Sequence, residues 1–257
     1  MKKIVIVSHS GGLDSSVLIA KAISMGYDVQ PINFNYGQKN LVEISAQKNV
    51  IGKFKEMYGE RLKDTLNLNF NNFLEPMIKK FQKARDTGII GDKTNLEYYM
   101  PFRNLTFASI CGMIGELMAL YEEYDEVLIG LGVHLHSEGN YSKNYWDITP
   151  EFVHKLNAVM ELNDSLTFGV FAPYKDGFKD QIIKDAKTLD VPYQLTWTCY
   201  NPKKEVTEFL DNNIEVTATP CLECESCKER ESMASLILTD VNKYSVTYKV
   251  EAWKVPF

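Results

Sequence analysis

The sequence predicts an α/β protein built on a doubly wound parallel sheet, followed by a small C-terminal metal-binding region. Short β-branched apolar runs alternate with longer helical patterns, as in folds that cover both faces of a parallel sheet with helices. Two of these runs end in glycine-containing turns, which are typical of the ligand-binding edge of such a sheet. From about residue 197 the alternation stops and cysteines cluster. We expect the sheet over residues 1–196 and a helical, cysteine-containing region over residues 197–257.

The first strand is expected over Lys3–Val7, where apolar β-branched residues follow one another as in a strand buried on both faces. The turn Ser8–Ser16 comes next, and Val17–Met25 then has a helical pattern that is closed by Gly26. The chain therefore begins as a strand, a Ser/Gly-rich turn and a helix.

This turn has the composition of an anion-binding loop. Gly11 and Gly12 allow the backbone to bring its N–H groups close to a ligand, and a helix N-terminus favours negative charge. Asp14 is unusual beside a phosphate, so we expect it either to cap the helix or to help hold a divalent metal. The alternative is a plain turn with an N-capping side chain. Hydroxyl donors are added by Ser8, Ser10, Ser15 and Ser16.

The alternation continues through the middle of the chain. A second strand is expected over Val29–Tyr36, a long helix over residues 41–54 and a third strand over Thr65–Phe70. Residues 71–100 are less regular, and we expect them to hold a short helix and a mobile segment that covers the site.

The second half of the sheet follows the same order. Thr149 and Pro150 predict a helix start with an N-cap and a proline at the first helical position. The expected elements are a helix from Pro101–Asn104 to about Tyr121, a strand over 125–132, a polar loop over 133–148, a helix from Thr149 to about Asn163, a strand over 166–171 and a helix over 178–189.

Composition limits the class of protein. The 257 residues carry a formal charge of −6, which argues against a protein that wraps nucleic acid with a basic face. The hydrophobic fraction of 45% is enough for an ordinary core. We see no apolar run that approaches the roughly 20 residues needed to span a bilayer, and no signal-peptide pattern precedes the first strand. We expect a cytoplasmic protein with no membrane partner.

Four of the five cysteines are spaced like metal ligands. Cys221, Cys224 and Cys227 form Cys-x-x-Cys-x-x-Cys, and Cys199 lies upstream. Four thiolates suit a closed, structural zinc site, while a reactive cysteine cluster or an iron–sulfur cluster is the alternative. Cys111 stands alone in a helical pattern and is expected to be a buried apolar residue.

Three further positions are candidates for ligand contacts. Arg103 and Asn104 begin a helix after a proline, where they would face an anion or form a solvated turn. Lys179 precedes a helical run and would reach a phosphate as a point charge, or lie on the surface. The segment Tyr36–Gln38 follows a strand and would recognise a nucleobase or simply form a turn.

The motifs together resemble a known family. The turn is similar to the Ser-Gly-Gly-x-Asp-Ser signature of the ATP pyrophosphatases, the PP-loop superfamily. Over nearly its whole length the chain resembles the 7-cyano-7-deazaguanine synthases, the QueC family. The matching segments, in the family's order, are Ser10–Ser16, Asn35–Gln38 with Glu43, Pro101–Asn104, Tyr145–Phe152, Pro173 with Lys179, Leu195–Tyr200 and the three clustered cysteines.

The resemblance implies an adenine nucleotide alpha hydrolase-like fold and an ATP-dependent, AMP-forming ligase. Its implied substrates are 7-carboxy-7-deazaguanine and ammonia, its product is 7-cyano-7-deazaguanine, and its implied cofactors are ATP, Mg²⁺ and Zn²⁺. By the family pattern, ATP and its metal would be bound by Ser8, Ser10, Gly11, Gly12, Leu13, Asp14, Ser15, Ser16, Asn35, Tyr36, Gln38, Arg103 and Asn104. The same pattern implies catalytic roles for Asp14, Lys179 and Arg103, and zinc ligation by Cys199, Cys221, Cys224 and Cys227.

Two segments depart from the family pattern. Tyr200–Pro220 lengthens the spacing between the first and second zinc cysteines, and we expect it to form an inserted helix or hairpin. The loop over residues 133–147 carries His134 and His136 and several extra residues. We expect both segments to decide which product is made, with the histidines binding the deazapurine or moving a proton, or serving only as loop residues.

These departures leave alternatives for the function. The product could stop at the amide, or the activated deazaguanine could be joined to a protein amine or a nucleic acid. A tRNA-modifying PP-loop enzyme is less favoured because the sequence shows no basic stripe. A catalytically silent nucleotide- and zinc-binding protein is the remaining class. The tail containing Trp253 would pack against a second subunit in a homodimer.

Overall fold

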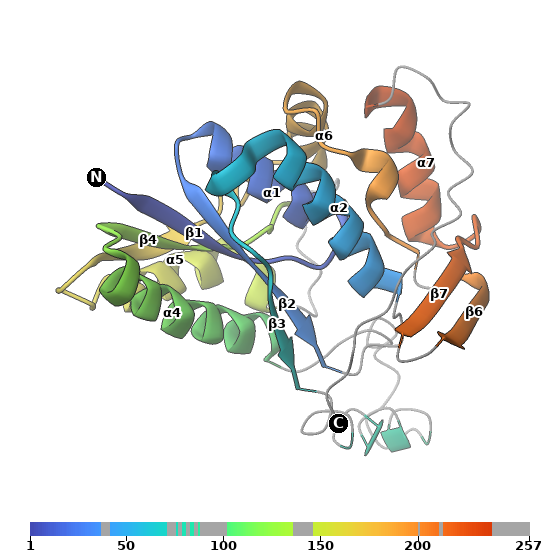
Figure 1. Cartoon of the computed structure of the whole chain (residues 1–257), viewed down its shortest axis with the longest axis horizontal. Coiled ribbons are helices and arrows are strands. Elements are labelled where there is room, and N and C mark those ends of the chain that lie inside the picture. Colours follow the sequence, from blue (N-terminus) through green and yellow to red (C-terminus); the bar gives the residue numbers. More distant parts are fainter. Residues whose placement is uncertain are drawn as a thin grey trace.

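The chain forms a five-stranded parallel sheet with helices on both faces and a two-stranded antiparallel hairpin beside it (Figure 1). This computed structural model describes residues 1–36, 42–70, 102–135, 146–199, 201–210 and 213–237, with isolated positions between 76 and 87. The sheet order β3-β2-β1-β4-β5 puts the first strand at the centre. The doubly wound α/β class predicted from the sequence is confirmed.

The bounds of the elements follow the predicted alternation. The strands are β1 (Lys3–Ser8), β2 (Asp28–Asn35), β3 (Leu66–Asn69), β4 (Glu126–Gly130), β5 (Thr167–Phe171), β6 (Lys203–Leu210) and β7 (Asn213–Thr219). The helices are α1 (Leu13–Ser24), α2 (Val42–Tyr58), α4 (Arg103–Glu122), α5 (Pro150–Met160), α6 (Lys179–Thr188) and α7 (Glu225–Ile237). Three short 3₁₀ turns are η1 (Gly59–Arg61), η2 (Trp146–Ile148) and η3 (Tyr193–Leu195).

Two helix ends differ from the expected positions. Helix α1 begins at Leu13 rather than at Val17, because Gly12 is the N-cap and the second half of the Ser/Gly-rich turn is already helical. Helix α5 ends at Met160 rather than near Asn163. The short helix and mobile segment expected over 71–100 fall largely outside the described residues.

The central strand explains why the sheet is stable. Ile4, Val5, Ile6 and Val7 of β1 are fully buried because helices cover both faces of the strand. Helices α1, α2 and α6 lie on one face, and α4 and α5 lie on the other (Figure 1). Helix α4 can approach the sheet closely at Gly115, where an added Cβ would lie 2.6 Å from a Val127 methyl carbon.

Helix α4 corrects the expectation that no apolar stretch approaches a membrane span. By its length of 20 residues and mean hydropathy of 1.2 it is the one helix in the described part of the chain that could cross a bilayer. It packs instead on β1 and β4 through residues such as Phe107, Ala108 and Cys111. Helix α4 is therefore a core helix of the α/β layer.

The C-terminal helix shares the core of the sheet. Helix α7 contacts α6, and its Met233 and Ile237 belong to the same apolar cluster as Val17 and Tyr193. The segment between the first and second zinc cysteines is the β6–β7 hairpin, one of the two forms expected for it. Division of the chain into units over 1–196 and 197–257 stays a prediction.

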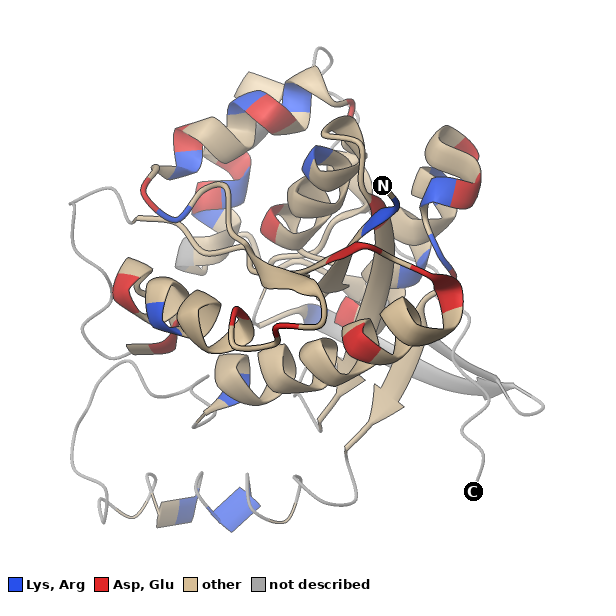
Figure 2. Cartoon of the chain, turned by 90° about the vertical axis from the view of Figure 1, so that its left-hand side faces the viewer, with Lys and Arg blue, Asp and Glu red and all other residues tan. Residues whose placement is uncertain are grey.

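Charges are mixed on the outer surface. Figure 2 shows basic and acidic residues interspersed along the helices of one face, in agreement with the modest net charge of −6.

Candidate functional site

The predicted phosphate loop joins β1 to α1 at the point where the sheet order reverses. Strand β1 pairs in parallel with β2 on one side and with β4 on the other. The chain builds outward through β2 and β3 and then returns to place β4 beside β1. Ligands of open α/β sheets bind outside the strand carboxyl ends at such a reversal.

The N-terminus of α1 is open to a ligand. Its N-cap is Gly12, and no side chain caps the helix. The N–H groups of Leu13, Asp14 and Ser15 belong to the first turn and have no acceptor within the helix. The expected cap by Asp14 or a serine is therefore wrong, and the uncapped helix end is suited to an anion.

Hydroxyls hold the loop from within. Ser15 Oγ accepts the N–H of Ser10 at 3.3 Å, and Ser16 Oγ donates to the carbonyl of Gly12 at 2.7 Å. Ser8 is the last residue of β1 and starts the turn. These contacts fix the shape of the loop without a bound ligand.

A buried imidazole lies beneath the loop. His9 is 1% exposed, and its Nε2 is 3.1 Å from Ser16 Oγ. Because Ser16 already donates to Gly12, Nε2 carries the proton and donates to Ser16. Within the described part of the chain Nδ1 of His9 has no hydrogen-bond partner. Burial lowers the pKa of His9 to about 3, so this imidazole is neutral.

Gly11 allows helix α2 to touch the loop. Its φ of +79° is a conformation that favours glycine. A Cβ at this position would lie 2.7 Å from both the Gln47 nitrogen and the Glu43 carbonyl oxygen. The first turns of α2 therefore press directly on the phosphate loop.

Asp14 and Lys179 form an ion pair at the start of α1. Lys179 Nζ donates to both carboxylate oxygens of Asp14, at 2.6 and 2.8 Å. His134 Nε2 lies 3.8 Å from the same carboxylate. The His134 Nδ1 is 2.9 Å from the carbonyl oxygen of Leu135, which can only accept, so Nδ1 carries a proton. One carboxylate thus contacts groups from two other loops.

A backbone contact holds those two loops together. The N–H of Leu135 donates to the carbonyl of Gly177 at 2.8 Å, and Leu135 forms a parallel β-bridge with Phe178. Since Phe178 is the N-cap of α6, this bridge sets the distance between His134 and Lys179. The sheet therefore presents a lysine, an imidazole and a carboxylate around one point.

A second group of predicted residues lies around the start of α4. Tyr36 follows β2, and its hydroxyl hydrogen-bonds to Arg103. Burial raises the pKa of Glu43 from 4.5 to about 7, while the nearby Arg103 lowers it. Burial also raises the pKa of Tyr36, which Arg103 lowers and Glu43 raises. Because the Glu43 backbone touches Gly11, this cluster adjoins the phosphate loop.

Asn104 bonds Asp147 at the start of α4, and its implied contact with a ligand stays a prediction. Its backbone N–H donates to the Asp147 carboxylate at 3.1 Å, and its side-chain amide donates to the Asp147 carbonyl at 3.2 Å. Asn104 thereby anchors η2 and the start of α5, where Thr149 caps the helix by accepting the Phe152 N–H at 3.1 Å. Asn35 ends β2. Gln38 and His136 lie outside the described residues.

The four clustered cysteines converge as predicted. The sulfurs of Cys199, Cys221, Cys224 and Cys227 all lie within 4.8 Å of one another, and Cys221 and Cys227 Sγ are 3.8 Å apart. A tetrahedral zinc with Zn–S bonds of about 2.3 Å separates its sulfurs by about 3.8 Å. The donor set and its spacing fit a zinc ion.

Backbone N–H groups support thiolate at this cluster. The N–H of Cys221 donates to Cys199 Sγ at 3.3 Å, and that of Cys224 donates to Cys221 Sγ at 3.3 Å. Burial raises the pKa of Cys221, but N–H bonds from Glu223 and Cys224 and the adjacent thiols lower it overall to about 6. Burial raises the pKa of Cys199 and Cys227.

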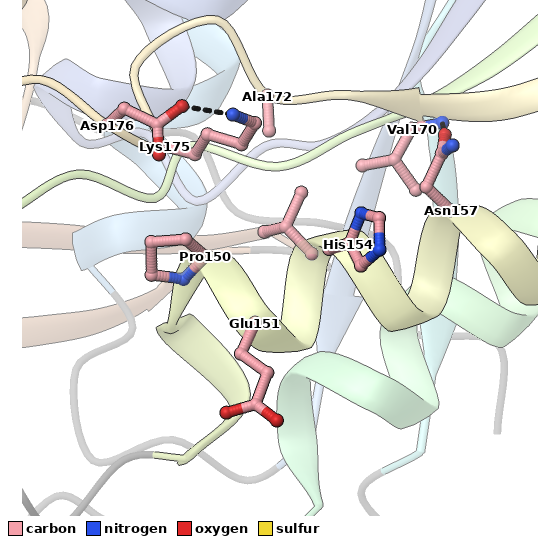
Figure 3. Close-up of a pocket in the computed structure, with 9 residues that line it drawn as sticks. Pro150, Glu151, His154, Asn157, Val170, Ala172, Lys175 and Asp176 are labelled. Carbon is pink, nitrogen blue, oxygen red and sulfur yellow. Dashed lines mark hydrogen bonds and ion pairs between the residues drawn. The ribbon is translucent and has the colours of Figure 1, made fainter.

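A pocket of about 570 Å³ lies apart from these groups, between α5 and the edge strand β5 (Figure 3). Helix α5 contributes Pro150, Glu151, His154 and Asn157, and Lys175 pairs with Asp176 on the opposite wall. None of the residues predicted to bind ATP or zinc lines it.

Sequence reasoning missed three contacts around the phosphate loop. The contact of His134 with Asp14 needs the Leu135–Phe178 bridge, for which no local pattern exists. Glu43 is predicted only as part of the motif that contains Asn35–Gln38. Its position shortly after Tyr36 is the one sequence feature that could have indicated its place near Arg103. Arg230 is buried and hydrogen-bonded, and an arginine on a short helix carries no such signal.

Comparison with known proteins identifies the family. The family model of queuosine biosynthesis protein QueC matches residues 3–236. A 7-cyano-7-deazaguanine synthase of Thermoplasma volcanium is 30% identical over 90% of this chain and 86% of its own length. That of Pseudoalteromonas translucida is 25% identical over 95% of this chain and 100% of its own length. Among solved structures, the NMN synthetase of Francisella tularensis aligns with 76% of this chain and 64% of its own, at 15% identity and a TM-score of 0.39. The chain belongs to the QueC family.

Proposed function

We propose that this chain is an ATP-dependent ligase that converts 7-carboxy-7-deazaguanine and ammonia into 7-cyano-7-deazaguanine. The observation that carries the proposal is the uncapped N-terminus of α1 beside Asp14, which Lys179 and His134 approach from two other loops. Family membership supports the deazapurine and ammonia as its substrates.

The first step makes a poor electrophile reactive. A carboxylate oxygen of the substrate attacks the α-phosphorus of ATP, which forms an acyl adenylate and releases pyrophosphate. The N–H groups of Leu13, Asp14 and Ser15 and the ammonium of Lys179 would hold the charge of the leaving phosphates. Ammonia then attacks the acyl carbon, AMP leaves with the C–O electron pair, one proton is released and the amide forms.

The second step repeats the activation on the amide. The amide oxygen attacks a second ATP and releases pyrophosphate and a proton. Loss of AMP and of the remaining nitrogen proton leaves the nitrile. His134 carries a proton on Nδ1, so in its neutral form Nε2 would accept a proton beside Asp14.

The donor set also fits a divalent cation with ATP. Asp14 offers a carboxylate in the first turn of the helix, and its side chain is 34% exposed. Bound Mg²⁺ would neutralise part of the charge on the departing pyrophosphate. Lys179 Nζ now contacts both carboxylate oxygens of Asp14. A cation bound to this carboxylate would displace the ammonium, which would then turn toward the phosphates.

We assign Tyr36, Glu43 and Arg103 to the acceptor side of the site. They lie at the end of β2 and the starts of α2 and α4, against the phosphate loop. Arg103 is a suitable partner for the substrate carboxylate because a guanidinium binds planar anions through two parallel hydrogen bonds. The four cysteines would hold a structural zinc ion, since four thiolates leave no open coordination position.

Product analysis tests the proposal. The purified protein is incubated with ATP, Mg²⁺, ammonium and 7-carboxy-7-deazaguanine, and AMP, pyrophosphate and the product mass are followed. We expect two AMP for each nitrile formed. One AMP with an amide product, or a mass shift on added protein or RNA, would move the function to one of the alternative acceptors. ATP binding without AMP release for any carboxylate would favour a non-catalytic binder and refute the proposal.

A further inference from the structure

An arginine of α7 is buried against the stretch of chain that contacts the phosphate loop. Arg230 of α7 is only 8% exposed, which is unusual for an arginine. Its Nη1 donates to Thr196 Oγ1 at 2.8 Å and to Thr198 Oγ1 at 3.0 Å, and its Nη2 donates to the carbonyl of Tyr193 at 2.8 Å. The guanidinium also lies over the Tyr193 ring, with its carbon 4.5 Å from the ring centroid.

A second contact between Tyr193 and Arg230 runs in the opposite direction. The Tyr193 hydroxyl donates to the backbone carbonyl of Arg230 at 2.5 Å. Thr196 Oγ1 donates in turn to the Tyr193 carbonyl at 2.8 Å. The guanidinium of Arg230 bonds Thr196, which precedes Trp197, and Thr198, which follows it. It therefore holds the chain on both sides of Trp197.

Trp197 passes this constraint to the phosphate loop. Its backbone N–H donates to the carbonyl of Gly11 at 2.9 Å. An added Cβ on Gly12 would lie 3.6 Å from the Trp197 carbonyl oxygen, so the segment lies directly against both glycines. The Gly11 carbonyl is therefore bonded by a backbone N–H from outside the loop, in addition to the hydroxyl contacts within the loop.

The direction of the Gly11 carbonyl decides where the next N–H points. In a trans peptide the C=O and the following N–H point to opposite sides. Because Gly11 C=O faces Trp197, the N–H of Gly12 faces the other side, where Ser10 Oγ lies 3.4 Å away. A peptide between two glycines has little steric resistance to flipping, so its orientation depends on the short bond from Trp197 and on the longer bond to Ser10 Oγ.

We propose that Arg230 is a positioning residue that keeps the Gly11–Gly12 peptide of the phosphate loop oriented for ATP. This inference rests on the proposed use of the loop for ATP. Loss of the guanidinium removes its hydrogen bonds to Thr196 and Thr198, weakens the Trp197–Gly11 bond and lets the Gly12 N–H turn away from the phosphates. A misplacement of about 1 Å in such a site costs up to about 10²-fold.

Nucleotide binding by matched variants tests the inference. Arg230→Met removes the hydrogen bonds to Thr196, Thr198 and the Tyr193 carbonyl, and Thr198→Val removes one acceptor with little change in shape. Glu231→Ala, an exposed neighbour on the same helix, is the control. The probe is a non-hydrolysable ATP analogue with Mg²⁺, measured by calorimetry, together with zinc content, melting temperature and ATP–pyrophosphate exchange.

We expect Arg230→Met to weaken analogue binding by about tenfold or more. Thr198→Val should weaken it less, and Glu231→Ala should leave it unchanged. Zinc content should be unchanged in each variant, at a temperature well below melting.

A lower melting temperature with unchanged analogue affinity in both variants means a purely structural role and overturns the inference. If Arg230→Met does not fold, Thr198→Val decides the result alone. A wild type that makes no nitrile but binds ATP in an Arg230-dependent way refutes the proposed function and supports this inference.

Discussion

Asp14 combines exposure with contacts that the fold alone does not need. Its carboxylate is 34% exposed and accepts two hydrogen bonds from Lys179, while the core beneath it is complete without it. A partly exposed pair of this kind contributes little to stability, about 1 kcal/mol or less. The carboxylate is therefore available for chemistry at the phosphates.

Replacing Asp14 should separate catalysis from folding. We expect Asp14→Asn to slow ATP–pyrophosphate exchange by about 10²–10³-fold, because one preorganised charged group is lost from the site. The melting temperature should change by only a few degrees. Asp180→Asn, the same substitution at an exposed first-turn position of α6, should leave exchange unchanged. Exchange at the wild-type rate in Asp14→Asn would remove Asp14 from the mechanism.

His9 shows how a residue under the loop links stability to pH. Burial lowers the pKa of His9 from 6.5 to about 3. Between these values the unfolded chain binds a proton that the folded chain does not, so this residue's contribution makes the protein less stable as the pH falls below 6.5. From pH 7 to pH 5 the loss from this one group is about 2 kcal/mol.

Urea unfolding at pH 7 and pH 5 measures that contribution. In His9→Phe the ring volume stays and the titrating group is gone, so the drop in unfolding free energy between the two pH values should be about 2 kcal/mol smaller than in the wild type. An equal drop in both proteins would mean that His9 is protonated in the folded state and that its environment is polar.

At the scale of elements, the cysteine cluster joins segments that are distant in sequence. Cys199 follows the stretch bonded to Gly11, and Cys221, Cys224 and Cys227 lead into α7. The cluster packs on Val42 and Ala46 of α2, the helix that also touches Gly11. A metal here would connect α2, α7 and the stretch before Cys199.

Removing one ligand should therefore unfold this junction. We expect Cys224→Ser to lose bound zinc and to lower the melting temperature by roughly 10 °C. The free energy of unfolding should fall by about 3 kcal/mol, and each kcal/mol shifts the melting temperature by about 2–4 °C in a chain of this size. Cys111→Ser is the control, because Cys111 is buried in α4 away from the cluster and should lose stability without losing zinc. Metal analysis that finds no zinc in the wild type, or an iron–sulfur absorption band, would contradict the assignment.

Local sequence patterns are sufficient to predict most helices and strands, the phosphate loop and the cysteine cluster. The run Lys3–Val7, the glycines of the loop and the Thr149–Pro150 helix start each depend on neighbours in sequence, and each appears where it was expected. The Cys-x-x-Cys-x-x-Cys spacing likewise brings its sulfurs together within a few residues. Helix α1 begins at Leu13 and not at the predicted Val17, because a loop and a first helical turn have similar patterns in a Ser/Gly-rich sequence.

The contacts between elements were beyond such reasoning. Asn104 bonds Asp147, and this pairing depends on how α4 and η2 meet, which no local pattern predicts. The bond from Trp197 to Gly11 joins residues that no periodicity connects. Both arise from tertiary packing, in which the sheet order brings the carboxyl ends of β1 and β4 to one edge.

At the scale of the whole molecule, the two segments that differ from the family pattern lie differently relative to the phosphate loop. The loop after β4 brings His134 to 3.8 Å from Asp14, whereas the β6–β7 hairpin lies outside the sheet that carries the loop. The phosphate loop lies at the centre of the sheet, while β6 and β7 pair with each other and not with the sheet. Strand β7 contacts α2, and Ala218 is fully buried in the cysteine cluster. The outer part of the hairpin can therefore be shortened without touching the loop.

Shortening the hairpin tests whether it selects the product. Val206 pairs with Thr217, so replacing residues 207–216 by Asn-Gly would close the strands with a two-residue turn in the native register. Because Ala218 and the four cysteines stay in place, we expect zinc content and ATP–pyrophosphate exchange to match the wild type. The ratio of nitrile to amide or conjugate, measured by mass spectrometry, should change, because pocket contacts set specificity. Nitrile formation at the full rate would show that the hairpin has no part in selecting the product. A loss of zinc would show that the hairpin belongs to the metal site instead.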